Sequence, residues 1–162
     1  MPLNRAEALE ALESGRAEEA RPAFVELLRA HPDDPQLNYY AAWAHDSLGL
    51  EREAIPFYRR ALANGLTGEE RASATLGLGS SLRWLGAYDE AIDVLEQGTR
   101  EFPDDRALKV FLAMAYYNMA REREAMEMVL TELAESSADE RIRRYRRAIE
   151  HYARDLDAMD GV

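Results

Sequence analysis

The segment YYAAWAHDSLG, residues 39–49, places a histidine beside an aspartate among three aromatic side chains. A histidine oriented by a carboxylate is the usual general base of acyl-transfer enzymes, so His45 and Asp46 are the first residues to consider for catalysis. The surrounding sequence is typical of a helix, however, and adjacent residues of a helix point in different directions. We therefore predict that His45 packs against the next helix, that Asp46 faces elsewhere, and that the two form no catalytic dyad.

No other group of residues has the spacing of a catalytic or metal site. The chain has no cysteine, and its three histidines are far apart, without a second ligand at metal-site spacing. It contains no G-x-S-x-G, Gly-rich phosphate loop or H-E-x-x-H motif. Its acidic pairs fall in turns or in the first turns of expected helices, where carboxylates complement the helix dipole. We predict no enzymatic activity, no cofactor and no metal.

The charge of the chain narrows the classes of partner. A net charge of −11 argues against nucleic acid or an anionic membrane surface. The distribution is uneven: residues 141–162 carry six arginines and four acidic residues, which leaves −13 on residues 1–140. The N-terminal residues lack the pattern of a secretion signal, and no apolar run is long enough to span a bilayer. We expect a cytoplasmic protein.

Four segments repeat one pattern, in which an acidic lead-in precedes an alanine and a large apolar residue follows four positions later. The pairs are Ala20 and Phe24, Ala54 and Tyr58, Ala91 and Leu95, and Ala125 and Val129. Their alanines are 34, 37 and 34 residues apart. Small residues let two helices approach closely, and the large residues are expected to fill the space between repeats. A period of this length is typical of stacked helix pairs.

Each repeat divides into two helices at a turn. The turns are expected at Gly15, Gly49 and Gly86, and at Ala120 in the fourth repeat. Aspartates that follow Pro32 and Pro103 can cap the next helices. Thr67 and Glu70 have the spacing of a capping box, which predicts that the first helix of the third repeat starts early.

This pattern resembles the tetratricopeptide repeat (TPR) family, whose 34-residue unit is a helix–turn–helix. The third repeat carries the best match, with Leu78, Gly79, Gly86, Tyr88, Ala91, Leu95 and Pro103. The fourth repeat departs at Glu132, where a small residue is usual. The resemblance covers residues 2–137 and implies an all-α, right-handed superhelical TPR solenoid, expected as one domain over residues 1–162. Its four repeats are expected at about residues 2–34, 35–68, 69–105 and 106–137.

A segment at about residues 139–158 breaks the repeat pattern and is expected to form a capping helix. Its apolar residues recur at three- and four-residue steps, as on one helix face: Ile142, Tyr145, Ile149, Tyr152, Leu156 and Met159. A solenoid needs a last element with one apolar face, so we predict that this helix packs on the fourth repeat. The basic run at residues 141–147 is interpreted as solvated or paired with the acidic body. A partner or anion site is the alternative.

In the TPR family the first helix of each repeat lines the concave surface of the superhelix. The matching positions of this chain are expected to form a groove rich in aromatic side chains. In the first repeat they are Arg5, Leu9 and Glu13, and in the second Tyr39, Trp43, Asp46 and Ser47. In the third they are Leu76, Ser80, Arg83 and Trp84, and in the fourth Val110, Met114, Tyr117 and Asn118.

The resemblance implies a non-catalytic protein–protein interaction module that binds a peptide or helical segment in this groove. Aromatic side chains and methionine would supply most of the binding energy, and Arg5, Asp46 and Arg83 would set its polarity. One alternative is that the aromatics pack on each other and on the cap and so close the groove. Another is a homo-oligomer in which the groove or the basic cap mediates self-association. Apart from Arg5, the chain lacks the clamp with which some TPR proteins hold a peptide C-terminus.

Overall fold

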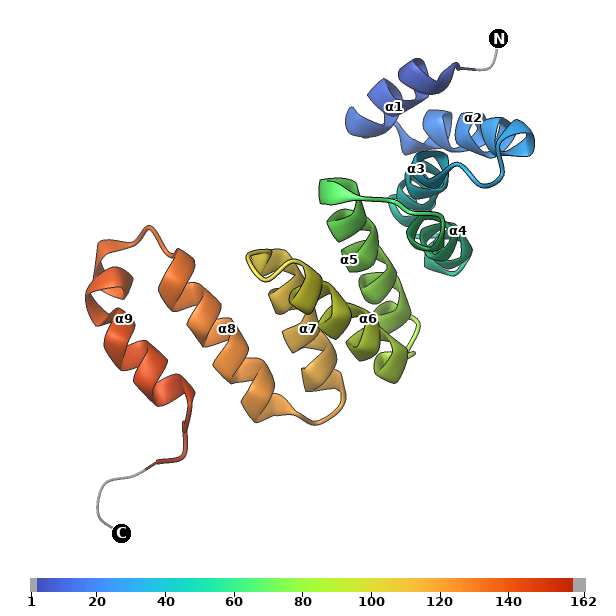
Figure 1. Ribbon diagram of the computed structural model, residues 1–162. Coiled ribbons are helices and arrows are strands. Elements are labelled where there is room, and N and C mark those ends of the chain that lie inside the picture. Colours follow the sequence, from blue (N-terminus) through green and yellow to red (C-terminus); the bar gives the residue numbers. More distant parts are fainter. Residues whose placement is uncertain (1–2, 159–162) are drawn as a thin grey trace. The chain divides into compact units, whose positions relative to one another are not determined.

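The computed structural model describes residues 3–158 of the chain. Within this range the chain forms nine α-helices and no strand. In order they are α1 (Arg5–Glu13), α2 (Ala17–Ala30), α3 (Pro35–Asp46), α4 (Glu51–Ala63), α5 (Gly68–Trp84), α6 (Tyr88–Glu101), α7 (Arg106–Asn118), α8 (Glu122–Ser136) and α9 (Glu140–Ala153). Short connections join each helix to the next (Figure 1). The all-α helical-repeat fold predicted from the sequence is confirmed for these residues.

The helices belong to two compact units, and the border between the units falls inside α6, between Val94 and Leu95. We call them the N-terminal unit and the C-terminal unit. In the N-terminal unit each helix from α1 to α5 packs on the next, and α3 also contacts α5. In the C-terminal unit α7 packs on α8, and α8 packs on α9. Within each unit, helices adjacent in sequence are therefore adjacent in space.

Left-handed backbone conformations mark the turns inside the helix pairs. Gly15, Gly49 and Gly86 have φ angles of 77°, 70° and 80°, which glycine adopts without a steric penalty. Ala120, between α7 and α8, has a φ of 55°. The four predicted turns are confirmed, and in the fourth an alanine takes a conformation that costs an L-residue about 1–2 kcal/mol.

The aspartate caps predicted from the sequence form at two helices. Asp34 accepts a hydrogen bond from the backbone N–H of Leu37 at 2.9 Å at the start of α3. Asp105 accepts from those of Ala107 and Leu108 at 2.9 and 3.2 Å at the start of α7. Each cap satisfies backbone donors that have no partner inside the helix, so local sequence is sufficient to place these two helix starts.

The predicted capping box at the start of α5 does not form. Thr67 precedes the first helical residue, Gly68, but its side chain makes no capping hydrogen bond. Glu70 turns to α3 instead, where its carboxylate accepts from the Tyr40 hydroxyl at 2.5 Å and from Gln36 Nε2 at 2.8 Å. The prediction of a capping box is therefore wrong, because contacts with α3 hold the Glu70 carboxylate that the box would require. The early start of α5 is confirmed.

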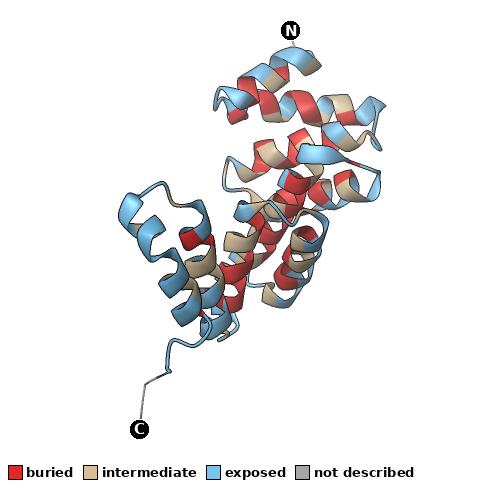
Figure 2. Cartoon of the chain, turned by 60° about the vertical axis from the view of Figure 1, so that its left-hand side comes forward, coloured by how far each residue is buried: buried red, intermediate tan, exposed pale blue. Residues whose placement is uncertain are grey.

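Small residues bring the helices of the N-terminal unit together, and large side chains fill the remaining space. Ala20, Ala42, Ala54 and Phe24 are completely buried, and Tyr58 is 3% exposed. Burial of a ring such as that of Phe24 stabilises a fold by roughly 1.5–3 kcal/mol. Figure 2 shows the buried residues of this unit on the faces that its helices turn toward one another.

Glycine at position 77 makes room for Tyr58. The tyrosine ring of α4 crosses α5 so closely that a Cβ atom on Gly77 would lie 2.4 Å from both Cζ and Oη of Tyr58. The hydroxyl of the same ring donates a hydrogen bond to Asp46 at 3.0 Å. The missing side chain at residue 77 therefore permits the close approach of α4 and α5.

The C-terminal unit holds a buried charge at the position where the family pattern has a small residue. Glu132 of α8 is 6% exposed, and its carboxylate pairs with Arg106 at 2.6 Å and with Lys109 at 3.1 Å, both on α7. Arg106 also pairs with Glu135 at 3.1 Å. A network of ion pairs thus joins α7 and α8.

The helix α9 packs on α8 through only part of its predicted apolar stripe. Ile142 and Ile149 are half-buried and Ala153 is buried, so a narrow line of α9 is covered. The other described members of the stripe are 53%, 61% and 46% exposed: Tyr145, Tyr152 and Leu156. Met159 lies outside the described residues. The prediction that the whole stripe packs is wrong, because both tyrosines lie about 60° around the helix from the isoleucines.

Val129 of α8 is a second correction in the C-terminal unit. The repeat pattern assigns it the role of filling the space between repeats, as Phe24 and Tyr58 do, but it is 39% exposed. Its neighbours Met126 and Leu133 on the same helix are 48% and 43% exposed. This side of α8 is therefore partly open to solvent.

Candidate interaction surfaces

The histidine that suggested chemistry is part of the packed interior. His45 is 5% exposed, and its ring stacks on Phe57 of α4 with 5.1 Å between ring centroids. Its Nδ1–H donates to the backbone carbonyl of Ala41 at 2.6 Å. The prediction that His45 packs against the second helix of its repeat is confirmed.

Asp46 joins three helices. From the end of α3 its carboxylate accepts hydrogen bonds from the Tyr58 hydroxyl of α4 at 3.0 Å and from Ser81 Oγ of α5 at 3.5 Å. Burial raises the pKa of Asp46, the hydrogen bond from Tyr58 opposes that rise, and the nearby charge of Glu51 adds to it. Asp46 was predicted to set the polarity of a groove, and that role stays a prediction, whereas its hydrogen bonds link α3 to α4 and α5.

Replacing Asp46 with asparagine is expected to change the pH dependence of stability. A carboxyl whose pKa is higher in the folded state favours folding below its unfolded pKa, near 3.9, and that contribution is lost as pH rises through the folded pKa. The free energy of unfolding of the wild type, minus that of Asp46→Asn, should therefore fall between pH 3 and pH 7. Urea titrations followed by circular dichroism measure this difference. A difference that rises with pH would contradict the assignment.

A chain of polar contacts runs across the first helices of three successive repeats. Arg5 of α1 donates to Asp34 at 3.2 Å and to Gln36 Oε1 at 2.7 Å. Gln36 in turn donates to Glu70 of α5, which also accepts from Tyr40. Arg5, predicted as a free groove residue, therefore helps hold α1 against α3.

The predicted groove aromatics of the N-terminal unit differ in exposure. Tyr39 and Trp43 of α3 are half-buried and stacked, with 6.2 Å between ring centroids and 24° between ring planes. Burial raises the pKa of Tyr39. Trp84, at the end of α5, is 69% exposed. The remaining predicted residues of α5 are half-buried: Leu76, Ser80 and Arg83.

In the C-terminal unit the four predicted groove residues lie on α7, and the first of them, Val110, is half-buried. Met114 is half-buried, Tyr117 is 65% exposed and Asn118 is exposed. Together with the residues of α3 and α5 they were predicted to line one groove. That single groove stays a prediction, whereas the exposure of Trp84 and Tyr117 is a property of each unit by itself.

Sequence reasoning missed a depression on the C-terminal unit, between α7 and α8. It has a volume of about 390 Å³, and its lining includes Lys109, Glu124, Glu127 and Glu132. The side chains around it are held by neighbouring groups. The Tyr116 hydroxyl donates to Glu96 at 2.8 Å, and the guanidinium of Arg121 lies 3.8 Å from the centroid of the Tyr116 ring. The sequence feature that pointed to this depression was Glu132, which stands where the family pattern has a small residue.

The described residues define a class of protein: stacked helical hairpins with exposed aromatic and charged side chains. Among residues 3–158, no helix is both long enough and apolar enough to cross a bilayer. The same range holds no cluster of three or more histidine, aspartate or glutamate side chains placed to bind a metal. The repeating arrangement of short helices is the feature to compare with known proteins.

The chain belongs to the tetratricopeptide repeat family. The family model described as Tetratrico peptide repeat matches residues 35–156, which is most of the chain. This match confirms the resemblance inferred from the spacing of alanines and glycines. Membership of the family supports a role as a protein–protein interaction scaffold.

Two solved structures share the fold. One, "MamA RS-1 ArsTM double mutant", has a TM-score of 0.72 and 20% identity, with coverage of 93% of this chain and 83% of that one. The other, "Crystal structure of MamA", has a TM-score of 0.70 and 16% identity, with coverage of 94% of both chains. At sequence identities of 20% and 16%, these two matches show a shared fold alone.

Proposed function

We propose that the protein is a non-catalytic scaffold that binds a peptide or helical segment of a partner protein through the exposed aromatic side chains of its first helices. The observation that carries the proposal is the exposure of Trp84 at the end of a helix that is otherwise mostly buried. A tryptophan that stays in contact with water loses the stabilisation of roughly 1.5–3 kcal/mol that burial of a large apolar side chain supplies. A partner that covers the ring recovers this energy.

The neighbours of Trp84 suit a contact of mixed character. Leu76, Ser80 and Arg83 lie eight, four and one residues before Trp84 on the same helix, so an apolar, a hydroxyl-bearing and a cationic residue accompany the tryptophan. Trp43 and Tyr39 form a stacked, half-buried pair on α3. On the C-terminal unit, Met114, Tyr117 and Asn118 of α7 are the residues proposed to contact a partner. Tryptophan, tyrosine and arginine are the residue types that dominate binding hot spots.

Substitution of Trp84 tests this function directly. Peptides selected from a random display library on the immobilised full chain would serve as probes, and their affinity would be measured by titration calorimetry. We expect Trp84→Ala to raise the dissociation constant by about tenfold or more, as for a hot-spot residue. Tyr152→Ala is the matched control, because Tyr152 is an exposed aromatic of α9 outside the proposed surface. Equal affinities of both variants and the wild type would rule out the proposed surface.

A further inference from the structure

One face of α9 displays arginine and tyrosine side chains that are exposed in the described part of the chain. The residues Arg141, Arg144, Tyr145, Ala148 and Tyr152 are spaced so that they fall on one side of the helix, and all are exposed. Tyr145 and Tyr152 are 53% and 61% exposed. Among the described residues, neither Arg141 nor Arg144 has an ion-pair partner. We call these five residues the α9 face.

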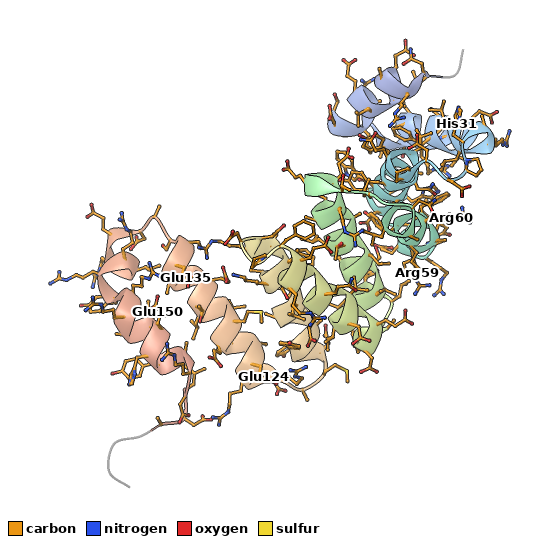
Figure 3. All side chains as sticks on the ribbon, in the orientation of Figure 1. His31, Arg59, Arg60, Glu124, Glu135 and Glu150 are labelled. Carbon is orange, nitrogen blue, oxygen red and sulfur yellow. The ribbon has the colours of Figure 1, made fainter. Side chains whose placement is uncertain are left out.

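The composition of the α9 face matches that of a protein–protein contact. Arginine and tyrosine are enriched at such contacts because each combines a large contact area with directional hydrogen bonding. The arginine of α9 that is engaged, Arg146, lies on another side of the helix and pairs with Glu150 at 2.6 Å. The Glu135 and Glu150 side chains labelled in Figure 3 come from α8 and α9. Glu135 and Glu150 thus pair with Arg106 and Arg146, and not with the α9 face.

The outward face of α1 has the complementary charge. Glu7, Glu10 and Glu13 are exposed, whereas Ala8 and Leu12 form the buried side of this helix. Glu7 is engaged as part of the capping box with Asn4. Glu10 and Glu13 have no ion-pair partner among the described residues. They flank the side of α1 that also exposes Ala6.

Several other exposed carboxylates of the chain are already paired with arginines. Glu19 binds Arg16 at 3.1 Å, and Glu90 binds Arg59 at 2.6 Å. These groups would have to exchange partners to bind α9. Glu10 and Glu13 have no ion-pair partner among the described residues and share one side of α1, and their three-residue spacing equals that of Arg141 and Arg144.

We propose that the α9 face of one copy of this chain docks on the Glu10–Glu13 face of α1 of a second copy. Arg141 and Arg144 pair with the two glutamates, and Tyr145 covers Ala6 and the stems of the glutamates. The two faces differ, so the contact is heterologous and each copy retains a free face of each kind. The assembly therefore grows by head-to-tail addition, into a ring or an open chain. This inference does not depend on the peptide-binding surface around Trp84.

The strength of such an assembly should respond to salt. Exposed ion pairs contribute only about 0–1 kcal/mol each and are screened at high ionic strength. We expect the mass measured by light scattering after size exclusion to rise with protein concentration in about 20 mM salt. In about 500 mM salt it should fall toward that of one chain. A monomer at every concentration in low salt would overturn the proposal.

Charge reversal on the two faces makes the test specific. Arg141→Glu/Arg144→Glu and Glu10→Arg/Glu13→Arg should each raise the dissociation constant of self-association by about tenfold or more. An equimolar mixture of these two variants should assemble again, because each reversed face meets a complementary face on the other variant. If the mixture stays monomeric while both variants keep their helical circular dichroism, the assigned pairing is wrong.

Arg143→Glu/Arg147→Glu is the matched control for these experiments. It makes the same change of charge on the same helix, but the two arginines are exposed on the opposite side of α9 from Tyr145. We expect this variant to self-associate within about twofold of the wild type at equal ionic strength. If it loses assembly as strongly as the α9-face variant, net charge and not the proposed face drives association, and the proposal fails.

Discussion

Replacing Gly77 with alanine is expected to lower the free energy of unfolding by about 1–3 kcal/mol, the usual cost of forcing extra volume into a packed interior. In an unobstructed helix the same change stabilises by roughly 0.5–1 kcal/mol, because glycine is a poor helix former. Here the new methyl group would lie 2.4 Å from the Tyr58 ring, which is 3% exposed and hydrogen-bonded to Asp46. Urea unfolding followed by far-ultraviolet circular dichroism measures the change.

A double-mutant cycle connects this loss to Tyr58. Tyr58→Leu removes the ring and should destabilise the chain by itself, because a buried aromatic side chain and its hydrogen bond to Asp46 are lost. In that background Gly77→Ala should cost little or become stabilising, since nothing occupies the position of the new methyl group. The double variant should therefore be more stable, by about 1–3 kcal/mol, than the sum of the two single losses predicts. A cycle with additive effects would show that the Tyr58 ring does not cause the loss.

Removing both cations that face Glu132 is expected to destabilise the C-terminal unit by about 2–3 kcal/mol, at the lower edge of the usual cost of an unpaired buried charge. The proposed variant is Arg106→Met/Lys109→Met, which removes both charges and keeps most of the apolar stem of each side chain. The side chain of Glu132 is 8% exposed in this network, whereas the side chains of Arg106 and Lys109 are 44% and 27% exposed. The cost therefore arises from the glutamate, because the two cations reach water and are partly screened. Thermal unfolding at pH 7 measures the loss.

The small residue that the family pattern places at position 132 provides the control. Glu132→Ala in the wild type leaves two partly exposed cations without a partner, and we expect a loss below about 1 kcal/mol. The same substitution in the Arg106→Met/Lys109→Met background should recover most of the lost stability, because no buried charge remains. If Glu132→Ala by itself is as harmful as the loss of both cations, packing and not charge is responsible.

The repeat architecture could be predicted from the sequence because its determinants are local. Ala20, Ala54 and Gly49 recur at the period of the repeat, and each acts within its own helix pair: alanine permits close approach and glycine permits the left-handed turn. The inward position of His45 followed from helical periodicity alone. These properties depend on which residues share a helix face, and the spacing of residues along the chain determines that.

The sequence by itself therefore determined the family, the helix pairs, the turns and, in α2 to α4, the residues that the helices turn inward. Only the tertiary structure decided which polar side chains meet, since these partners are about one repeat apart in the chain. Glu70 reaches Tyr40 and not Thr67, and Asp46 reaches Ser81, because stacking brings neighbouring repeats within hydrogen-bonding distance. The structure also separated Trp43, stacked and half-buried, from Trp84, which is exposed. Helical periodicity assigns both tryptophans to one face, but exposure depends on what the adjacent helix covers.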